Sequence, residues 1–210
     1  MSNERLCPYF KLGRHTQEST STQTVIDALE LEKHIEGGYF AEIDRDLRTV
    51  PNPFLDAHDG PTTTAQPFSG DNNIRNASTS IYYLLTPVSP QGHFHRNKGR
   101  TVHTAIEGRG RYVLIHADEE GTEKRVESFI VGKDVSRGEK PVWIVEGGKY
   151  KASFLLPIGG GQEESDRLLI SETVVPGFEY SDHDFLPLDK FKKLVTVEQS
   201  AELQWLVRTE

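Results

Sequence analysis

Three histidines, His93, His95 and His103, lie close together in a segment with the composition of β-strands. Because alternate side chains of a strand share one face, His93 and His95 are expected on the same face, and His103 joins them if the register holds. Imidazoles exchange protons near neutral pH and bind transition metals. The segment therefore predicts a metal site, an acid–base site or the remnant of such a site.

The composition narrows the class of protein. The chain has 210 residues, a formal net charge of −8 and one cysteine, Cys7. This length fits a single compact domain, and the acidic balance argues against nucleic acid as a partner. We find no apolar run typical of a signal or membrane-spanning segment, so no membrane partner is expected. The sequence predicts a cytoplasmic protein, with the nucleus as an alternative location.

Three segments flank or interrupt the expected core domain, which we place at residues 21–187. Residues 1–20 are polar and predict an N-terminal tail. Residues 51–77, with four prolines among Asp, Asn, Gly and a run of three threonines, predict a long irregular loop. Residues 188–210 predict a helical segment in which Thr196 and Gln199 form a capping box. A short helix beginning near Thr22 or Thr24 is expected to end at Glu30.

Between these segments the pattern favours short strands separated by turns. They are expected at 39–43, 80–85, 92–96, 100–107, 110–116, 125–131, 141–145, 149–156 and 168–175. A turn at 97–99 would make His95 and His103 a cross-strand pair. Such regular spacing predicts an all-β fold, either a sandwich or a closed barrel.

Several sequence words resemble the cupin superfamily, specifically a small microbial and fungal subfamily whose members mostly lack assigned activities. The words are His34-Ile35-Glu36-Gly37-Gly38-Tyr39-Phe40, Ser78 to Leu85, Phe94-His95-Arg96, Lys151-Ala152-Ser153-Phe154 and Val174 to Asp182. The resemblance implies a jelly-roll β-barrel, commonly a homodimer, with a small-molecule pocket inside the barrel beside the histidine-containing strand.

The same resemblance argues against the metal of other cupins. A metal-bearing cupin usually supplies His-x-His, a carboxylate a few residues later and a third histidine, whereas here only His93-Phe94-His95 is present. Thr101 stands where this subfamily often has glutamate, and residues 141–149 contain no histidine. We therefore expect no cofactor and no metal; the alternative metal set is His93, His95 and His103.

Without a metal, a cupin pocket can work by proton transfer, as in the related metal-free sugar epimerases. His95 or His103 would then be the base, and Tyr83, or its neighbour Tyr82, the acid. The two tyrosines cannot both point inward, because neighbouring residues of a strand face opposite sides.

Further residues are predicted to contact a ligand. Glu172 either orients an imidazole or is a surface residue of an edge strand. Tyr39 is a candidate for the pocket wall, and Lys151, whose charge opposes a bound cation, is a candidate ligand contact. Arg100 belongs to a basic group that would suit an anionic substrate; the other members are Arg96, Lys98, Arg109 and Arg111. Four further histidines are interpreted as structural or surface residues: His34, His58, His116 and His183.

The leading expectation is a cupin that binds a small molecule and acts as a metal-independent isomerase or epimerase on an anionic or sugar-nucleotide-like substrate. Two alternatives remain open. One is a ligand-binding or storage-like cupin without catalysis, and the other is a metal-dependent cupin oxygenase.

Overall fold

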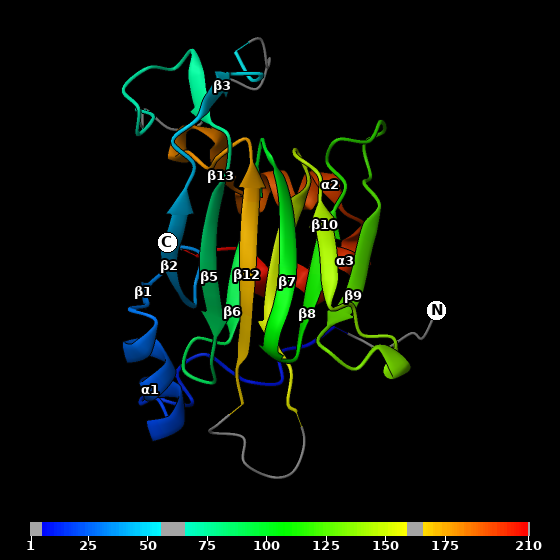
Figure 1. Ribbon diagram of the computed structural model, residues 1–210. Coiled ribbons are helices and arrows are strands. Elements are labelled where there is room, and N and C mark those ends of the chain that lie inside the picture. The colour runs from blue at the N-terminus through cyan, green and yellow to red at the C-terminus, as the bar shows by residue number, and fades with distance from the viewer. Residues whose placement is uncertain (1–5, 56–65, 159–165, 210) are drawn as a thin grey trace.

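The computed structural model describes residues 6–55, 66–158 and 166–209. Most of these residues form two antiparallel sheets that face each other (Figure 1). The six-stranded sheet has the order β1 (Glu32–Lys33), β2 (Tyr39–Arg45), β5 (Thr79–Leu85), β12 (Leu168–Val175), β7 (Arg100–Gly108) and β10 (Val142–Val145). The five-stranded sheet has the order β13 (His183–Phe185), β6 (Gln91–Asn97), β11 (Tyr150–Leu155), β8 (Gly110–Ile115) and β9 (Val126–Val131). Over the described residues, the strand ladders do not join the two sheets into one closed barrel, so the all-β jelly roll is a sandwich.

The sequence predicts these strands well because successive side chains alternate between the two faces of a sheet. Eight of the expected strands, from 80–85 to 168–175, are confirmed to within one residue at each end. Tyr83 and Ile170 pack between the sheets, whereas Leu84 and Leu169 face outward against α1 (Thr20–Ala28). Tyr82 also packs on the outer side, so only one of the two neighbouring tyrosines points inward, as predicted.

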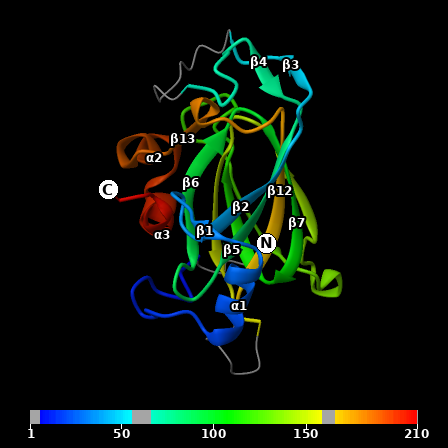
Figure 2. The same ribbon diagram turned by 60° about the vertical axis from the view of Figure 1, so that its left-hand side comes forward.

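Helices cover the outer face of the five-stranded sheet. They are α2 (Leu188–Leu194), α3 (Val197–Leu203) and the 3₁₀ turn η4 (Gln204–Leu206), which lie on the side of β6 and β13 away from the other sheet (Figure 2). Phe94 of β6 stacks on Phe191 of α2 in this outer core. The predicted capping box of Thr196 and Gln199 begins α3. Among the helices of the described ranges, none has the length and apolar character that crossing a membrane requires.

The predicted pairing of β6 with β7 is wrong. The two strands follow each other in the chain, but β6 belongs to the five-stranded sheet and β7 to the six-stranded one. The turn after Asn97 therefore crosses from one sheet to the other, as jelly-roll connections do. His95 and His103 face the interior from opposite sheets and are not cross-strand partners.

The N-terminal half differs from prediction in three places. The helix α1 begins at Thr20, because the Ser19 side chain accepts a hydrogen bond from the Thr22 amide. Phe10, within the predicted tail, is buried in the inner core. The predicted loop at 51–77 contains part of a small hairpin of β3 (Thr49–Pro51) and β4 (Ile74–Asn76). Residues 56–65 of this loop, including His58, lie outside the described residues.

Two further 3₁₀ turns complete the described elements. The turn η1 (Val135–Arg137) follows β9, and η3 (Tyr180–Asp182) leads directly into β13. A buried ion pair holds η3 against the hairpin, because Arg75 Nε of β4 lies 2.6 Å from Asp182 Oδ2. This pair fixes the approach of β13 to the edge of the five-stranded sheet.

Candidate functional site

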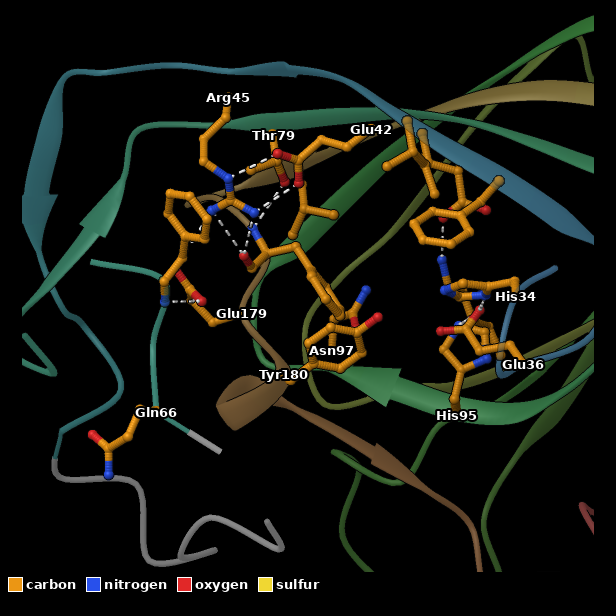
Figure 3. A pocket seen from close by; sticks show the side chains of 17 residues that line it. His34, Glu36, Glu42, Arg45, Gln66, Thr79, His95, Asn97, Glu179 and Tyr180 are labelled. Atoms are coloured by element: carbon orange, nitrogen blue, oxygen red, sulfur yellow. Dashed lines mark hydrogen bonds and ion pairs between the residues drawn. The ribbon is translucent and has the colours of Figure 1, made fainter. Parts of the chain in front are cut away.

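A cavity of about 350 Å³ lies between the two sheets at the end of the sandwich where β2 and β6 finish and β5 begins. Arg45, Thr79, Asn97 and Val174 mark this end, because they are the terminal or near-terminal residues of their strands. Figure 3 shows two groups of polar side chains at opposite ends of the cavity, one around Arg45 and Glu179 and the other around His34, Glu36 and His95. Phe68, beside Arg45, is 79% exposed, while Glu36 and His95 are buried. The group around Arg45 is therefore at the mouth, and the group around Glu36 is deep in the cavity.

The turn between β1 and β2 carries Glu36 to the interior. The Glu36 carbonyl accepts a 2.7 Å hydrogen bond from the His93 amide, which ties the turn to β6. Gly37 makes this approach possible because it has φ +103° and because a Cβ atom there would overlap the Gln91 carbonyl oxygen. The paired glycines of the sequence thus serve to bring the Glu36 carboxylate beside His95.

Glu36 joins two histidines from adjacent strands. Its Oε2 lies 3.2 Å from His95 Nε2, and its Oε1 lies 2.9 Å from His183 Nε2. In the β13–β6 register His183 is opposite Asn97, two residues from His95 and on the same face. The rings of His95 and His183 consequently stack, with centroids 5.4 Å apart.

Electrostatics at this end favour a charged Glu36 carboxylate and a neutral His95 imidazole. Burial alone would raise the pKa of Glu36, but the opposing contributions of His95, His34 and His183 bring it well below its usual value. Burial lowers the pKa of His95 to about 3, against the raising effect of Glu36. Glu36 is therefore an anion at neutral pH and His95 is neutral.

A second polar cluster crosses the interior from sheet to sheet. Lys151 of β11 donates from Nζ to Glu172 Oε2 at 2.6 Å and to His103 Nε2 at 2.9 Å. Burial raises the pKa of Glu172, but Lys151 and His103 outweigh it, so the net pKa is lowered. Burial, with the charge of Lys151, lowers the pKa of His103, so the lysine ammonium faces one carboxylate and one neutral imidazole.

The mouth is held by an arginine between two carboxylates. Arg45 lies 2.7 Å from Glu42 and 3.5 Å from Glu179, and its guanidinium lies over the Phe68 ring. Glu179 also accepts a 2.7 Å hydrogen bond from the Phe68 amide. Phe178 and Tyr180 line the same region, so the aromatic residues after Pro176 form part of the cavity wall.

The structure brings together some of the predicted site residues. His95, Lys151 and Glu172 line the cavity, and Glu172 belongs to a central strand, not an edge strand. His103 is fully buried against Trp143, with ring centroids 5.0 Å apart, and contacts the cavity residues Lys151 and Glu172 without lining the cavity itself.

Three other predicted site residues lie elsewhere. Tyr83 is on the inner side, but its hydroxyl donates to the Gly37 carbonyl at 2.9 Å and does not line the cavity. Burial raises its pKa well above the usual value, which makes it a poor acid. Tyr39 faces outward against α1 and donates to Glu18, because the alternation of β2 turns Phe40, not Tyr39, inward. Arg100 is exposed and lies 3.5 Å from Glu146.

The alternative metal set of His93, His95 and His103 does not assemble, because a β-bulge interrupts β6. Lys151 is opposite His95 while Ser153 is opposite Gly92, so three steps in β6 match two in β11. His93 turns away from the interior, and its ring lies near Gln91. Thr101 has no carboxylate and does not supply the missing ligand. These residues therefore do not fit the metal site of metal-bearing cupins.

Sequence reasoning missed Glu36, His34 and His183. His34 and His183 were expected to be structural or at the surface, but His34 lines the cavity and His183 contacts Glu36. His116 is structural, buried at 3.2 Å from Glu127 at a distance from this cavity. The glycine pair after Glu36 was the available signal, since it indicates a close backbone approach next to a carboxylate.

The fold and the interior site define the class of protein. A jelly-roll sandwich with a polar cavity and a histidine on an inner strand is typical of cupins, and the chain belongs to the cupin superfamily. The family described as "Cupin superfamily (DUF985)" matches residues 23–186.

Three similar proteins have names that state no function. The chain is 45% identical over 190 residues to the uncharacterized protein YML079W of Saccharomyces cerevisiae, covering 89% of this chain and 86% of the relative. A hypothetical protein from Leishmania major has a structure with a TM-score of 0.69 at 26% identity, over 89% of this chain and 98% of its own. Protein SO0799 from Shewanella oneidensis has a TM-score of 0.65 at 23% identity, over 93% of this chain and 100% of its own, and supports the fold alone.

Proposed function

We propose that this cupin binds a small polar molecule in its cavity and transfers a proton on it, with Lys151 and Glu172 as the reacting pair. The observation that carries the proposal is the buried Lys151 side chain, which lines the cavity and is bonded to both Glu172 and His103. Buried acid and base groups at a cavity are the usual means of general acid–base catalysis.

The arrangement supports reversible proton transfer. Lys151 carries the proton, and Glu172 and His103 both accept hydrogen bonds from it. A ligand carbonyl or hydroxyl beside Lys151 can receive a proton from the ammonium. Once Lys151 has given up this proton, the charge that lowers the pKa of Glu172 is gone, so Glu172 becomes a stronger base and can take a proton from a neighbouring carbon or oxygen. His103 touches Lys151 but does not line the cavity, so it is a positioning residue. An isomerase or epimerase can use such an acid and base within one cavity.

The charges of the cavity favour a neutral, hydroxyl-rich ligand over the anion expected from the sequence. Both cationic side chains that line the cavity, Arg45 and Lys151, are already bonded to carboxylates. The basic residues near β6 and β7 do not line the cavity. Arg96 pairs with Asp184, Arg100 with Glu146, and Arg109 with Glu139. Carboxylates and aromatic rings such as Phe40 and Phe178 suit the polar and apolar faces of a sugar-like molecule.

Deuterium exchange tests this proposal. The protein is incubated in D₂O with a panel of monosaccharides, sugar acids and nucleotide sugars, and carbon-bound deuterium is measured by NMR. Lys151→Met should abolish exchange on any active compound. Lys149→Met is the control, because Lys149 pairs with Asp118 away from the cavity and should leave exchange unchanged.

The outcomes separate catalysis from binding. Ligand-detected NMR that shows binding without exchange would contradict catalysis and favour the ligand-binding alternative. Equal exchange in wild type and Lys151→Met would remove Lys151 from the mechanism. The homodimer and the cytoplasmic, or also nuclear, location stay predictions.

A further inference from the structure

The deep end of the cavity holds three metal-ligating side chains from distant parts of the chain. We propose that Glu36, His95 and His183 form a binding site for a divalent transition metal ion. Within the residues that the structure describes, this is the group of histidine and carboxylate side chains whose ligand atoms all lie within 4.8 Å of one another. The site goes beyond the proposed proton transfer and does not depend on it.

The spacing of the ligand atoms fits a metal ion. Ligand bonds of about 2.1 Å at tetrahedral or octahedral angles place neighbouring ligand atoms about 3.0–3.4 Å apart. Glu36 Oε2 lies 3.2 Å from His95 Nε2, and Glu36 Oε1 lies 2.9 Å from His183 Nε2. The carboxylate therefore already lies at ligand spacing from both imidazoles, and one ligand atom from each of the three residues falls within 4.8 Å of the others.

The hydrogen bonding of His95 presents a lone pair to the site. His95 Nδ1 lies 2.8 Å from the His93 carbonyl oxygen, which only accepts, so Nδ1 carries the hydrogen. Nε2 is then the ring atom that is directed at the Glu36 carboxylate, 3.2 Å from Oε2. A metal ion between them would accept a lone pair from each. The Nδ1 bond to a backbone carbonyl is also the support that metal-ligating histidines usually have.

His34 provides a second, independent observation. Its side chain is 8% exposed, and its Nδ1 lies 3.5 Å from Glu36 Oε2. Within the described residues this Nδ1 atom has no hydrogen-bond partner. A buried polar atom without a partner is costly. In Figure 3 His34 points at Glu36 from the same end of the cavity as His95, so a water molecule or hydroxide on the metal would satisfy it.

The donor set selects the kind of metal. Two imidazole nitrogens and one carboxylate suit zinc or iron(II), cobalt(II) and nickel(II), rather than magnesium or calcium, which prefer oxygen ligands. His183 is buried behind Glu36 and His95, both of which line the cavity, so the remaining coordination positions face the cavity. A ligand in the cavity would reach the metal and Lys151 from the same space.

Cobalt(II) is the probe for this site because its bound form absorbs visible light. Full-length protein is treated with EDTA, dialysed and titrated with Co²⁺ alone, and Zn²⁺ affinity is measured by calorimetry. Wild type should give the visible bands of a nitrogen- and oxygen-ligated Co²⁺ ion at one equivalent. Glu36→Gln and His183→Gln should each weaken Zn²⁺ binding at least about 100-fold, because even supporting residues of metal sites cost 10–100-fold.

The control is His116→Gln. His116 is a buried histidine with two carboxylates nearby, Glu127 at 3.2 Å and Glu119 at 3.4 Å, and should leave Zn²⁺ binding unchanged. Thermal unfolding establishes that each variant is folded. If Glu36→Gln does not fold, the Zn²⁺ affinity of His183→Gln tests the site. A wild-type titration without Co²⁺ bands, or unaltered affinity in a folded His183→Gln protein, would overturn the site. Lys151→Met should retain the Co²⁺ bands while losing deuterium exchange, so the two proposals fail separately.

Discussion

Lys151 lies directly opposite His95 in the β11–β6 strand pair, and both side chains face the cavity. This one register position connects the two polar clusters of the interior. His95 belongs to the group around Glu36, and Lys151 belongs to the group around Glu172. The β-bulge beside this position allows His95, rather than His93, to face inward.

The Lys151–Glu172 ion pair should show strong coupling in unfolding experiments. The two side chains are 4% and 10% exposed, so removing either leaves a buried charge. We expect Lys151→Met and Glu172→Leu each to lower the free energy of unfolding by about 3–5 kcal/mol. The double variant should lose less than either single one, because it leaves neither charge. Urea denaturation measures all four proteins, and additive losses would show that the pair is not coupled.

Stability should fall as the pH drops below about 6.5, and His103 should account for part of the fall. Burial lowers the pKa of His103 in the folded protein, so the unfolded chain takes up a proton that the folded protein refuses. This contribution to stability is complete above about pH 6.5 and is lost below it, at up to about 1.4 kcal/mol per pH unit. Denaturation at pH 7.5, 6 and 5 should give a smaller slope for His103→Gln than for wild type. His116→Gln serves as the comparison, and identical slopes in wild type and His103→Gln would contradict the assignment.

Gly37 should tolerate alanine poorly. Its φ is +103°, and an added Cβ would overlap the Gln91 carbonyl oxygen. We expect Gly37→Ala to cost about 2–3 kcal/mol, since strain at such a position adds to the clash. Gly138→Ala is the matched control, with φ +80° and open space around it, and should cost about 1 kcal/mol. Thermal and urea unfolding compare the two, and equal costs would mean that the contact with β6 is unimportant.

The buried pair of Arg75 and Asp182 should influence the site without touching a ligand. Asp182 directly precedes His183, and its side chain is 7% exposed against 1% for Arg75. Asp182→Asn should lower the free energy of unfolding by about 3–5 kcal/mol, because the Arg75 charge stays buried. It should also weaken Zn²⁺ binding through displacement of His183. Calorimetry at a temperature where the variant is folded tests the second effect, and unchanged affinity would limit the pair to a stabilising role.

Local patterns predicted the strands and the Thr196 capping box because these depend on neighbouring residues. They did not predict the bulge in β6, since Gly92-His93-Phe94-His95 has an ordinary alternating appearance. The strand alternation of β2 was visible in Tyr39-Phe40, but which of the two faces inward depends on where α1 packs. The local sequence therefore identified the strands but did not determine which of their side chains face the interior.

Most of the candidate site depends on long-range pairing. Glu36 and His183 are separated by 147 residues and meet only because β13 joins the edge beside β6. The connection from β6 to β7 was expected to be a hairpin, and its crossing between the sheets follows from the whole jelly roll. His95, Lys151 and Glu172 were found because the resemblance and the strand pattern placed them on inner strands.

The contacts of Glu179 have a consequence for the rate at which a ligand enters. This one carboxylate joins Arg45 on β2 to the Phe68 amide across the outer end of the cavity. A molecule that enters there must pass between segments held together by an ion pair whose side chains are only 15% and 6% exposed, and dissolved salt screens such buried pairs little. The association rate of an uncharged ligand should therefore depend only weakly on ionic strength.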